Sequence, residues 1–531
     1  MNRDGATKSI WQDAVDEFNP VNAWDKDKNY DALIIGGGIT GLTTALVLQE
    51  KGMKCILAEA HHIAFGTSGG TTAHLNTLLD TPYYQVEKDF GADAAAHLAV
   101  GAREAIDLIE GLVTKYHIDC DFAYKTAYLF AETKEEVEEL AQIREANNKV
   151  SVVTDWSNTI PVPIAFEKAL KIEFQAQLHA TKYLNALAKA FEENGGVILL
   201  HCVVTSLTED KLITADTSLG TIQASCAVYA THIPPGVNIF SFRCAPYRSY
   251  VMAFTLKTGQ YPDGLAYDMK DPYHYFRTHS INGQNYVIAG GYDHKTGHNA
   301  NTEYVFTELE AYLRKHFDID IIAYKWSSQY YSSVDGLPYI GVMPSYDQVY
   351  AATGFGGNGM ILGSLAAKTL CALISNDETP YESLFEPGRI KLIAGFTNFL
   401  KENADVVSEL ISRRFSYRQV TELAALAPGE ATIAEWDSSP RHFEWGFSRP
   451  WLSLVPLSDS LLRRRRRSAR CRRGLATATS EEIERGSPNS RGGRYSELSR
   501  ARPPARLRDI SPSVLCFEKT STPQSGLIEP P

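Results

Sequence analysis

The hydrophobic pattern is clearest near the start of the chain. An uninterrupted apolar run over residues 32–35 is typical of a strand buried inside a parallel sheet. Apolar residues then recur at helical spacing over residues 42–48, and Gly52 ends that pattern. A second strand is expected over residues 54–58, directly before Glu59. The pattern therefore predicts a strand, a helix and a second strand over residues 31–59.

The rest of the chain alternates between helical and strand patterns. Helical spacing predominates over residues 86–150, and a helix followed by a strand is expected over residues 180–207. A further strand over residues 224–231 ends in small residues. Alternating aromatic and polar residues over 240–330 predict a twisted antiparallel sheet. Residues 349–374 again read as a strand, a glycine-rich turn and a helix, so we predict an α/β fold.

The first turn carries the spacing of a dinucleotide-binding motif. Gly36 allows a tight turn, Gly38 lets a pyrophosphate approach the backbone, and Gly41 lets the helix pack closely on the sheet. The helix N-terminus, including Ile39 and Thr40, offers free N–H groups to the phosphates. Glu59 lies about 20 residues beyond the glycines, where a carboxylate accepts hydrogen bonds from a ribose. The alternative is a glycine-rich turn without a ligand, but the ordered series of elements favours dinucleotide binding.

A second segment rich in small and hydroxyl residues follows Glu59. Such a segment can place backbone N–H groups and hydroxyls against pyrophosphate and ribityl groups. A plain surface loop is the alternative, and proximity to the glycine motif favours the ligand. The expected contacts are Ala60, Thr67, Ser68, Thr71, Thr72 and Ala73.

The net charge of −11 is unevenly distributed. Residues 437–531 hold 17 Arg and one Lys against 10 Asp and Glu, whereas residues 1–436 hold 34 Lys and Arg against 53 Asp and Glu. The body is therefore strongly acidic, which disfavours binding of nucleic acid or an anionic membrane by that part of the chain.

Cysteine usage and hydropathy indicate a cytoplasmic protein. The eight Cys are scattered, with no CxxC pair or Cys/His cluster, so we expect reduced thiols and no metal site. The first 20 residues lack the apolar segment of a signal peptide, and no apolar run is long enough for a transmembrane helix.

Four motifs in order carry a family resemblance over residues 30–415. DALIIGGGITGL with Glu59, GTSGGTTAHL, DGLPYIG and YAATGFGGNGMILG resemble the FAD-dependent amine oxidoreductases of the D-amino-acid oxidase and glycine oxidase type. YHYFR and GGYDHKTG resemble a bacterial branch whose members carry a C-terminal Rieske domain. The resemblance implies an FAD cofactor and a Rossmann-like FAD-binding domain interleaved with an α+β antiparallel-sheet substrate domain.

The resemblance also implies how the domains divide the chain. The FAD-binding domain is expected to comprise three segments, and the substrate domain two, with a polar leader before them over residues 1–29. The segments are 30–85, 175–235 and 335–390 for the FAD-binding domain, 86–174 and 236–334 for the substrate domain, and 391–436 for a helical extension and linker.

Further site residues follow from the resemblance. FAD is expected to contact Val204 near the adenine and the turn after the last sheet strand, where the following helix would face the flavin pyrimidine edge. The residues of that turn are Gly354, Gly356, Gly357, Asn358, Gly359 and Met360. Arg277 is a candidate to clamp a substrate carboxylate, with Tyr275 and His274 beside it. The family often shows an Arg shortly before its DGLP-like motif, and this chain instead has Gln329, Tyr330 and Tyr331.

The implied reaction is hydride transfer from a C–N bond of an amine or amino acid to the flavin, with oxygen or an electron carrier as acceptor. Two alternatives stay open, namely a dehydrogenase that feeds an electron carrier and a non-catalytic FAD-binding assembly factor. We expect FAD to be held without a covalent bond, because there is no Cys between Cys244 and Cys371. His74 is the residue that could form such a bond.

The last 95 residues depart from the resemblance. A Rieske site needs two Cys and two His, whereas residues after 436 include only His442, Cys471 and Cys516. The Arg/Ser/Pro-rich composition of residues 437–531 predicts a disordered basic tail, with an acidic-surface or nucleic-acid patch as the alternative. The abrupt loss of Lys near residue 437 also suggests a shifted reading frame.

Overall fold

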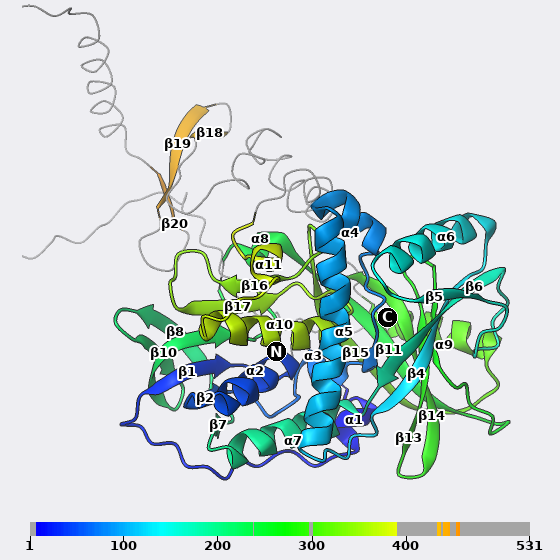
Figure 1. Cartoon of the computed structure of the whole chain (residues 1–531), viewed down its shortest axis with the longest axis horizontal. Helices are drawn as coiled ribbons and strands as arrows, with labels where there is room; N and C mark the ends of the chain where they lie inside the picture. Colours follow the sequence, from blue (N-terminus) through cyan, green and yellow to red (C-terminus); the bar gives the residue numbers. More distant parts are fainter. Residues whose placement is uncertain are drawn as a thin grey trace, which may run out of the picture. The chain divides into compact units, whose positions relative to one another are not determined.

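The computed structural model describes residues 7–236, 238–296 and 301–389, together with three strands between residues 433 and 456. Residues Met1–Asp459 form one structural unit and Ser460–Pro531 a second, and the second lies outside the described residues. The first unit contains two large sheets and the helices around them (Figure 1).

The first sheet is mostly parallel and is built around β1 (Tyr30–Ile35). Its strand order is β16-β17-β10-β1-β2-β7, with β16 antiparallel at one end and a β8–β9 hairpin attached through β10. β1 is buried along almost its whole length, as its continuous apolar sequence predicts. The other strands are β2 (Cys55–Ala58), β7 (Val197–Leu199), β8 (Val204–Glu209), β9 (Ile213–Thr217), β10 (Gly220–Tyr229), β16 (Tyr339–Val342) and β17 (Val349–Thr353).

Helices pack on this sheet and on one another. α2 (Ile39–Glu50) follows β1 and contacts both α7 (Ala180–Glu193) and α10 (Gly359–Ile374). The long helix α5 (Ala92–Lys115) packs against α10 and crosses the molecule between the two sheets in the view of Figure 1. α10 is apolar around most of its circumference because it is covered by α2, α5 and the sheet.

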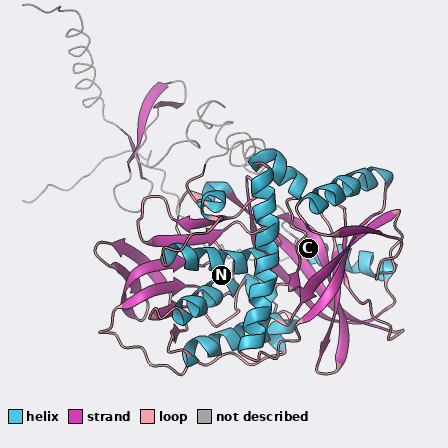
Figure 2. Cartoon of the chain, viewed as in Figure 1, coloured by secondary structure: helices cyan, strands magenta, loops and turns pink. Residues whose placement is uncertain are grey.

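The second sheet is mainly antiparallel, with strand order β15-β11-β14-β13-β12-β4-β6-β3 and β5 paired to β6. This sheet lies on the other side of helix α5 from β1, as Figure 2 shows in the same view as Figure 1. Its strands are β3 (His74–Leu75), β4 (Ala123–Ala131), β5 (Thr154–Ser157), β6 (Lys168–Gln177), β11 (Cys244–Leu256), β12 (Leu265–Asp268), β13 (Tyr275–Ile281), β14 (Gln284–Lys295) and β15 (Ile319–Ser333).

Helices also cover parts of the second sheet. α9 (Thr302–His316) contacts β11, β14 and β15, and its Val305, Leu309 and Leu313 enter a core with the aromatic residues of those strands. α6 (Lys134–Lys149) begins with a capping box in which Thr133 and Glu136 satisfy each other's backbone N–H groups. The remaining helices are α1 (Ile10–Asp13), α3 (Thr67–Gly70), α4 (Tyr83–Phe90), α8 (Phe240–Arg243) and α11 (Glu382–Phe385).

This architecture confirms the predicted α/β fold with a parallel sheet and a separate antiparallel sheet. The parallel sheet draws its strands from residues 30–58, 197–229 and 339–353, and the antiparallel sheet from residues 74–75, 123–177 and 244–333. The exact domain boundaries stay a prediction, because both sheets belong to one structural unit. No helix among the described residues is both long enough and apolar enough to cross a membrane.

Three short strands lie around residue 437, from which disorder was expected. β18 (Ile433–Trp436), β19 (Ser439–Gly446) and β20 (Ser453–Pro456) form a three-stranded antiparallel sheet. Short antiparallel neighbours need only local pairing. Residues 391–432 and the rest of 437–531 lie outside the described residues, as do the expected helical extension and the expected disorder there.

Candidate active site

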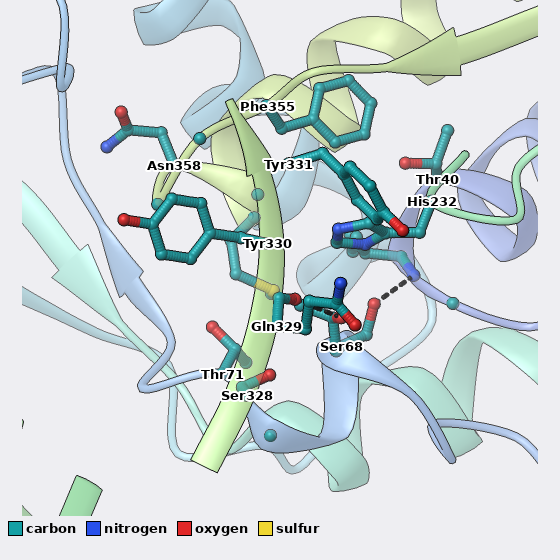
Figure 3. Close-up of a pocket in the computed structure, with 18 of the residues that line it drawn as sticks. Thr40, Ser68, Thr71, His232, Ser328, Gln329, Tyr330, Tyr331, Phe355 and Asn358 are labelled. Atoms are coloured by element: carbon teal, nitrogen blue, oxygen red, sulfur yellow. Dashed lines mark hydrogen bonds between the residues drawn. The ribbon is translucent and has the colours of Figure 1, made fainter. Parts of the chain in front are cut away.

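One cavity of about 660 Å³ is lined by residues of both sheets (Figure 3). Its walls come from the β1–α2 turn, the segment after β2, the ends of β8 and β10, the strands β11 and β15, and the β17–α10 turn. These include carboxyl ends of the parallel strands, where open α/β sheets bind their ligands. Its volume falls within the usual range for a small-molecule or cofactor site.

The glycine turn has the geometry that its sequence predicts. Gly36 has a φ of +115°, and a Cβ there would lie 2.5 Å from the carbonyl oxygen of Ala230. A Cβ on Gly38 would lie 2.9 Å from the Ser68 hydroxyl, on the cavity side of the turn. Gly41 does not line the cavity. A Cβ added to Gly41 would lie 1.9 Å from the Gly36 carbonyl oxygen. Only glycine therefore permits α2 to approach β1 this closely.

Glu59 lies at the end of β2 and lines the cavity. One of its carboxylate oxygens accepts the N–H of Gly37 at 2.6 Å, and the other accepts the N–H of His61 at 2.8 Å. These bonds fix the carboxylate beside the glycine turn. Since an ionised carboxylate has about four lone-pair positions, two hydrogen bonds leave acceptor capacity for hydroxyls in the cavity.

The hydroxyl-rich segment forms a single helical turn, α3, rather than an open loop. The Ser68 hydroxyl accepts the N–H of Ile39 at 3.0 Å, which ties α3 to the start of α2 (Figure 3). The Thr67 hydroxyl donates to the carbonyl of Gln329 on β15 at 2.8 Å. The predicted contacts Ile39, Thr40, Ala60, Thr67, Ser68, Thr71 and Thr72 all line the cavity, whereas Ala73 lies behind it.

The N-terminal leader holds this segment in place, which the sequence reading missed. The Trp11 indole donates to the Thr71 carbonyl at 2.6 Å, and the Gln12 amide donates to the Ala64 carbonyl at 2.9 Å. The Ser9 hydroxyl bonds to the Gly69 carbonyl, and the Ser9 and Trp11 residues are fully buried. We call residues 9–12 the strap, because they fasten the segment that lines the cavity.

The β17–α10 turn supplies another wall. Gly356, Gly357, Asn358, Gly359 and Met360 line the cavity, as does Val204 at the start of β8. Gly354 does not line it, since Gly354 packs against Ser333 with a φ of +80°. Sixteen of the nineteen residues predicted to contact the cofactor thus line the cavity, while Gly41, Ala73 and Gly354 do not.

Asp80 was not anticipated at this turn. Its carboxylate accepts the N–H of Gly357 at 2.6 Å, and its own N–H donates to the Asn358 side-chain oxygen at 2.7 Å. Burial raises the pKa of Asp80, while the Gly357 N–H lowers it. A carboxylate therefore already lies at the start of α10, where the sequence reading expected free N–H groups. Asp80 lies in the irregular segment before α4, where no periodic pattern marks it.

Arg277 does not face the cavity, so its expected role as a carboxylate clamp is wrong. Its guanidinium is fully buried and donates to the backbone carbonyls of Thr72, Ala73 and Leu178 at 2.7, 2.9 and 3.2 Å. Its other terminal nitrogen lies 2.6 Å from His279 Nδ1, and the Trp11 ring covers it. Burial lowers the pKa of Arg277 to about 9. Arg277 thus positions the backbone that follows α3.

His274 also lies outside the cavity lining, and only Tyr275 of the three predicted catalytic residues is part of it. The His274 ring bonds through Nδ1 to Asp268 at 2.6 Å and stacks on Tyr312, while its Nε2 is buried without a hydrogen bond. The Tyr275 hydroxyl lies 2.7 Å from the Ser249 hydroxyl. Burial raises the pKa of Tyr275 far above the physiological range, so its hydroxyl stays protonated.

Behind Tyr275 lies a carboxylate that the sequence reading did not single out. Asp293 on β14 accepts hydrogen bonds from the hydroxyls of Ser249 and of Tyr330, the latter at 2.9 Å. Ser249 and Tyr330 line the cavity, and Asp293 is one layer further back. The pKa of Asp293 is raised to about 7. Burial is the largest cause, the two hydroxyls act against it, and nearby Asp80 adds to it.

Three polar atoms in the wall have no partner among the described residues. His74 Nε2, the side-chain oxygen of Asn76 and the Ser328 hydroxyl are buried without a hydrogen bond, and all three residues line the cavity. Together with the glycine cradle around Gly36 and Gly38, these atoms fit a long polar ligand such as a dinucleotide. The lining residues therefore fit an FAD, with the glycine turn and Glu59 at one end and the β17–α10 turn at the other.

The comparisons with known proteins agree with this fit. A family model described as FAD dependent oxidoreductase (DAO) matches residues 31–373, which is more than half of the chain. The chain belongs to this DAO family. It is therefore an FAD-dependent oxidoreductase, and its cofactor is FAD.

Individual relatives of this DAO-family chain can be named. YhfW of Bacillus subtilis, whose name describes it as a Rieske 2Fe-2S iron-sulfur protein, is 31% identical over 80% of this chain and 84% of its own length. The gamma-glutamylputrescine oxidoreductase of Escherichia coli is 23% identical over 71% of this chain and 91% of its own. Glycine oxidase of Geobacillus kaustophilus has the same fold, with a TM-score of 0.56, 18% identity, and coverage of 68% of this chain and 99% of that one.

Proposed function

We propose that this DAO-family protein oxidises a C–N bond of an amine or amino acid. The observation that carries the proposal is the pairing of the cofactor cradle with a tyrosine-rich wall in one cavity. Gly36, Gly38 and Glu59 lie at the cradle, and Tyr275 and Tyr330 lie on the opposite wall, on strands of the antiparallel sheet. The names of the relatives given above, which include an amine oxidoreductase and a glycine oxidase, support the same substrate class.

The residues have separate roles in this proposal. The β1–α2 turn with Ser68 would hold the pyrophosphate, because the start of α2 presents N–H donors there. Glu59 would hold a ribose, because its carboxylate beside Gly37 is a hydrogen-bond acceptor. The start of β8, with Val204, would contact the adenine. Gly356 to Met360 would contact the flavin ring. FAD bound there supplies a two-electron acceptor for the hydride on the carbon next to nitrogen.

The wall formed by the second sheet would orient the substrate and exclude water. Tyr273, Tyr275 and Tyr330, which we call the tyrosine cluster, present their side chains to the cavity. The rings of Tyr273 and Tyr275 are 5.8 Å apart, and Tyr247 stacks on Tyr330. Such packing fixes the hydroxyls before a substrate arrives, so less freedom is lost when the substrate is bound.

We also propose that FAD is bound without a covalent link. Cys202 is the only cysteine in the lining among the described residues, and it lies beside Val204, at the end expected for the adenine. His74 lines the cavity, and burial with nearby Arg277 lowers its pKa. Acid precipitation should release the yellow colour into the supernatant, and colour that stays in the pellet of the native protein but is lost in His74→Ala would contradict this.

An isotope experiment tests the proposed reaction. A primary amine deuterated at the carbon that carries nitrogen should reduce the flavin several-fold more slowly than the unlabelled amine, because cleavage of that C–H bond is the oxidative step. Stopped-flow absorbance without oxygen measures both rates. Equal rates together with a product still carrying the nitrogen on an sp³ carbon would contradict oxidation of a C–N bond.

A further inference from the structure

The cavity has two sides, separated by β15. Figure 3 shows Tyr330 and Tyr331 pointing to opposite sides of this strand, as neighbouring strand residues do. Tyr331 lies against His232, on the side of Thr40 and Ser68. Tyr330 lies on the side of Asn358 and reaches Asp293. The first side belongs to the glycine turn. The second side borders the β17–α10 turn, the proposed flavin contact, so a substrate on this side would lie beside the flavin ring.

Three hydroxyls on the substrate side, those of Tyr330, Ser249 and Tyr275, form hydrogen bonds that lead to Asp293. Tyr330 and Ser249 both donate to the Asp293 carboxylate. A serine hydroxyl has only one proton, so the 2.7 Å contact between Ser249 and Tyr275 must be donated by Tyr275. Three hydroxyls thus use their only protons within the wall, and toward the cavity they present lone pairs.

Asp80 adds a second acceptor on this side. Its carboxylate lies at the start of α10, and the Tyr273 hydroxyl lies next to it, 2.8 Å from the position that a Cβ on Gly357 would take. Neither Asp80 nor Asp293 forms an ion pair with a Lys, Arg or His of the described residues. When they are ionised, two carboxylates without a cationic partner in the described part of the chain are electrostatically unbalanced, and a cationic ligand would balance them.

Donors for an anionic ligand are missing from the same region. The lining holds no arginine among the described residues, and its single lysine, Lys270, forms an ion pair with Glu132 at 2.9 Å. Arg277, the nearest candidate clamp, is committed to three backbone carbonyls. A carboxylate is held most strongly by a charged donor such as Arg or Lys, and the described lining offers no such donor that is not already paired.

We propose that the substrate is an amine that binds as its ammonium ion and carries no carboxylate beside the reacting nitrogen. This inference rests on the proposed function and narrows its substrate class. The ammonium group donates to the oxygens of Tyr330, Ser249 and Tyr275, while Asp80 and Asp293 supply the compensating negative charge. An ammonium ion has three donors and no acceptor, which is the complement of this wall.

A pair of unreactive ligands tests the proposal separately from turnover. tert-Butylammonium and pivalate share the same apolar group, and neither has a C–H bond next to nitrogen that could be oxidised. Each is titrated into the FAD-loaded protein at pH 8, with binding followed by the shift of the visible flavin spectrum and by calorimetry. We expect tert-butylammonium to bind at least about ten-fold more tightly, the effect of one charge-assisted hydrogen bond. Equal affinities, tighter pivalate, or no binding of either would overturn the proposal.

Asp293→Asn provides the matched variant. An amide nitrogen at this position donates to one of the neighbouring hydroxyls and frees that hydroxyl to donate into the cavity. The variant should therefore bind tert-butylammonium about ten-fold more weakly and pivalate at least as well as the wild type. Asp155→Asn, which makes the same charge change on an exposed residue of β5, should leave both affinities unchanged. An unchanged preference in Asp293→Asn would contradict the assignment of this wall.

The outcomes also separate this inference from the proposed function. A preference for tert-butylammonium in a protein whose flavin no amine or amino acid reduces would support the substrate-side assignment and refute the oxidation. Reduction of the flavin by α-amino acids in a protein that prefers pivalate would support the oxidation and refute the ammonium site.

Discussion

Individual residues of this protein are committed by their hydrogen bonds to one role each. Arg277 serves the backbone around Ala73 rather than a ligand, and Asp80 accepts the Gly357 N–H of the β17–α10 turn. Asp293 differs from both, because its carboxylate partners among the described residues are the two hydroxyls of Ser249 and Tyr330, which line the cavity. A carboxyl group in such a place is costly when ionised, which is common at functional sites and rare elsewhere.

The cost of ionising Asp293 predicts a pH-dependent stability. Its pKa is about 7 in the folded protein and near 4 when unfolded. The contribution of Asp293 to the free energy of unfolding is therefore fully present below pH ~4, and it is lost as the pH rises through about 7. The neutral side chain of Asp293→Asn cannot ionise and does not suffer this loss. The melting temperature of the variant minus that of the wild type should therefore be a few degrees larger at pH 8 than at pH 5. Scanning calorimetry of the ligand-free protein measures this, with Asp155→Asn as control, and parallel curves would contradict it.

At the scale of elements, the cavity depends on pieces that are far apart in the sequence. The α3 segment is held by the strap from the N-terminus, by Arg277 from β13 and by Gln329 from β15. Because α3 has only four residues, it cannot hold its shape alone. The strap therefore acts on the cofactor wall although it lines no part of it.

Removing one strap hydrogen bond should weaken cofactor binding. Trp11→Phe keeps the buried ring but loses the donor to the Thr71 carbonyl, and a single net hydrogen bond corresponds to a loss of FAD affinity of about 2–10-fold. Reconstitution of the apoprotein, followed by quenching of flavin fluorescence, measures this affinity. Trp24→Phe is the matched control, since Trp24 lies in the same leader but packs beside Gly220, away from α3. Equal affinities in both variants would show that the strap does not support the wall.

The sequence predicts this site unevenly, for reasons that particular residues make clear. Gly36, Gly38 and Glu59 lie within one local strand–helix–strand unit, so their spacing is enough to place them. Tyr275 and Arg277 lie on the same face of β13, two residues apart, and the pattern cannot tell which end of that face reaches the cavity. Asp80 comes from an irregular segment, and Asp293 acts through partners on two other strands.

At the scale of the whole molecule, the cavity is built from the first two thirds of the chain. All of its lining residues fall between Ile35 and Met360, within the unit Met1–Asp459. The Rieske domain of the resembling branch, and the name of the relative YhfW, concern a C-terminal part of the chain and not the residues that line this cavity. The hypothesis of a shifted reading frame near residue 437 remains a prediction for gene resequencing.

Deletion of residues 460–531 should therefore leave a folded yellow protein. The cavity and its supporting strap, strands and helices are all retained in Met1–Asp459, so FAD content per chain and melting temperature should equal those of the full chain. Absorbance and scanning calorimetry of the two purified proteins measure both quantities. Aggregation or loss of flavin in the shortened protein would show that the deleted residues are needed by the body.

The most direct test of the central claim is reduction of the bound flavin by an amine without oxygen. The purified protein is mixed anaerobically with a panel of primary amines, secondary amines and amino acids, and the visible absorption of oxidised FAD is followed. The account predicts that at least one amine bleaches the flavin and yields the carbonyl product expected after hydrolysis of an imine. A flavin that dithionite bleaches but that no amine or amino acid reduces would contradict it.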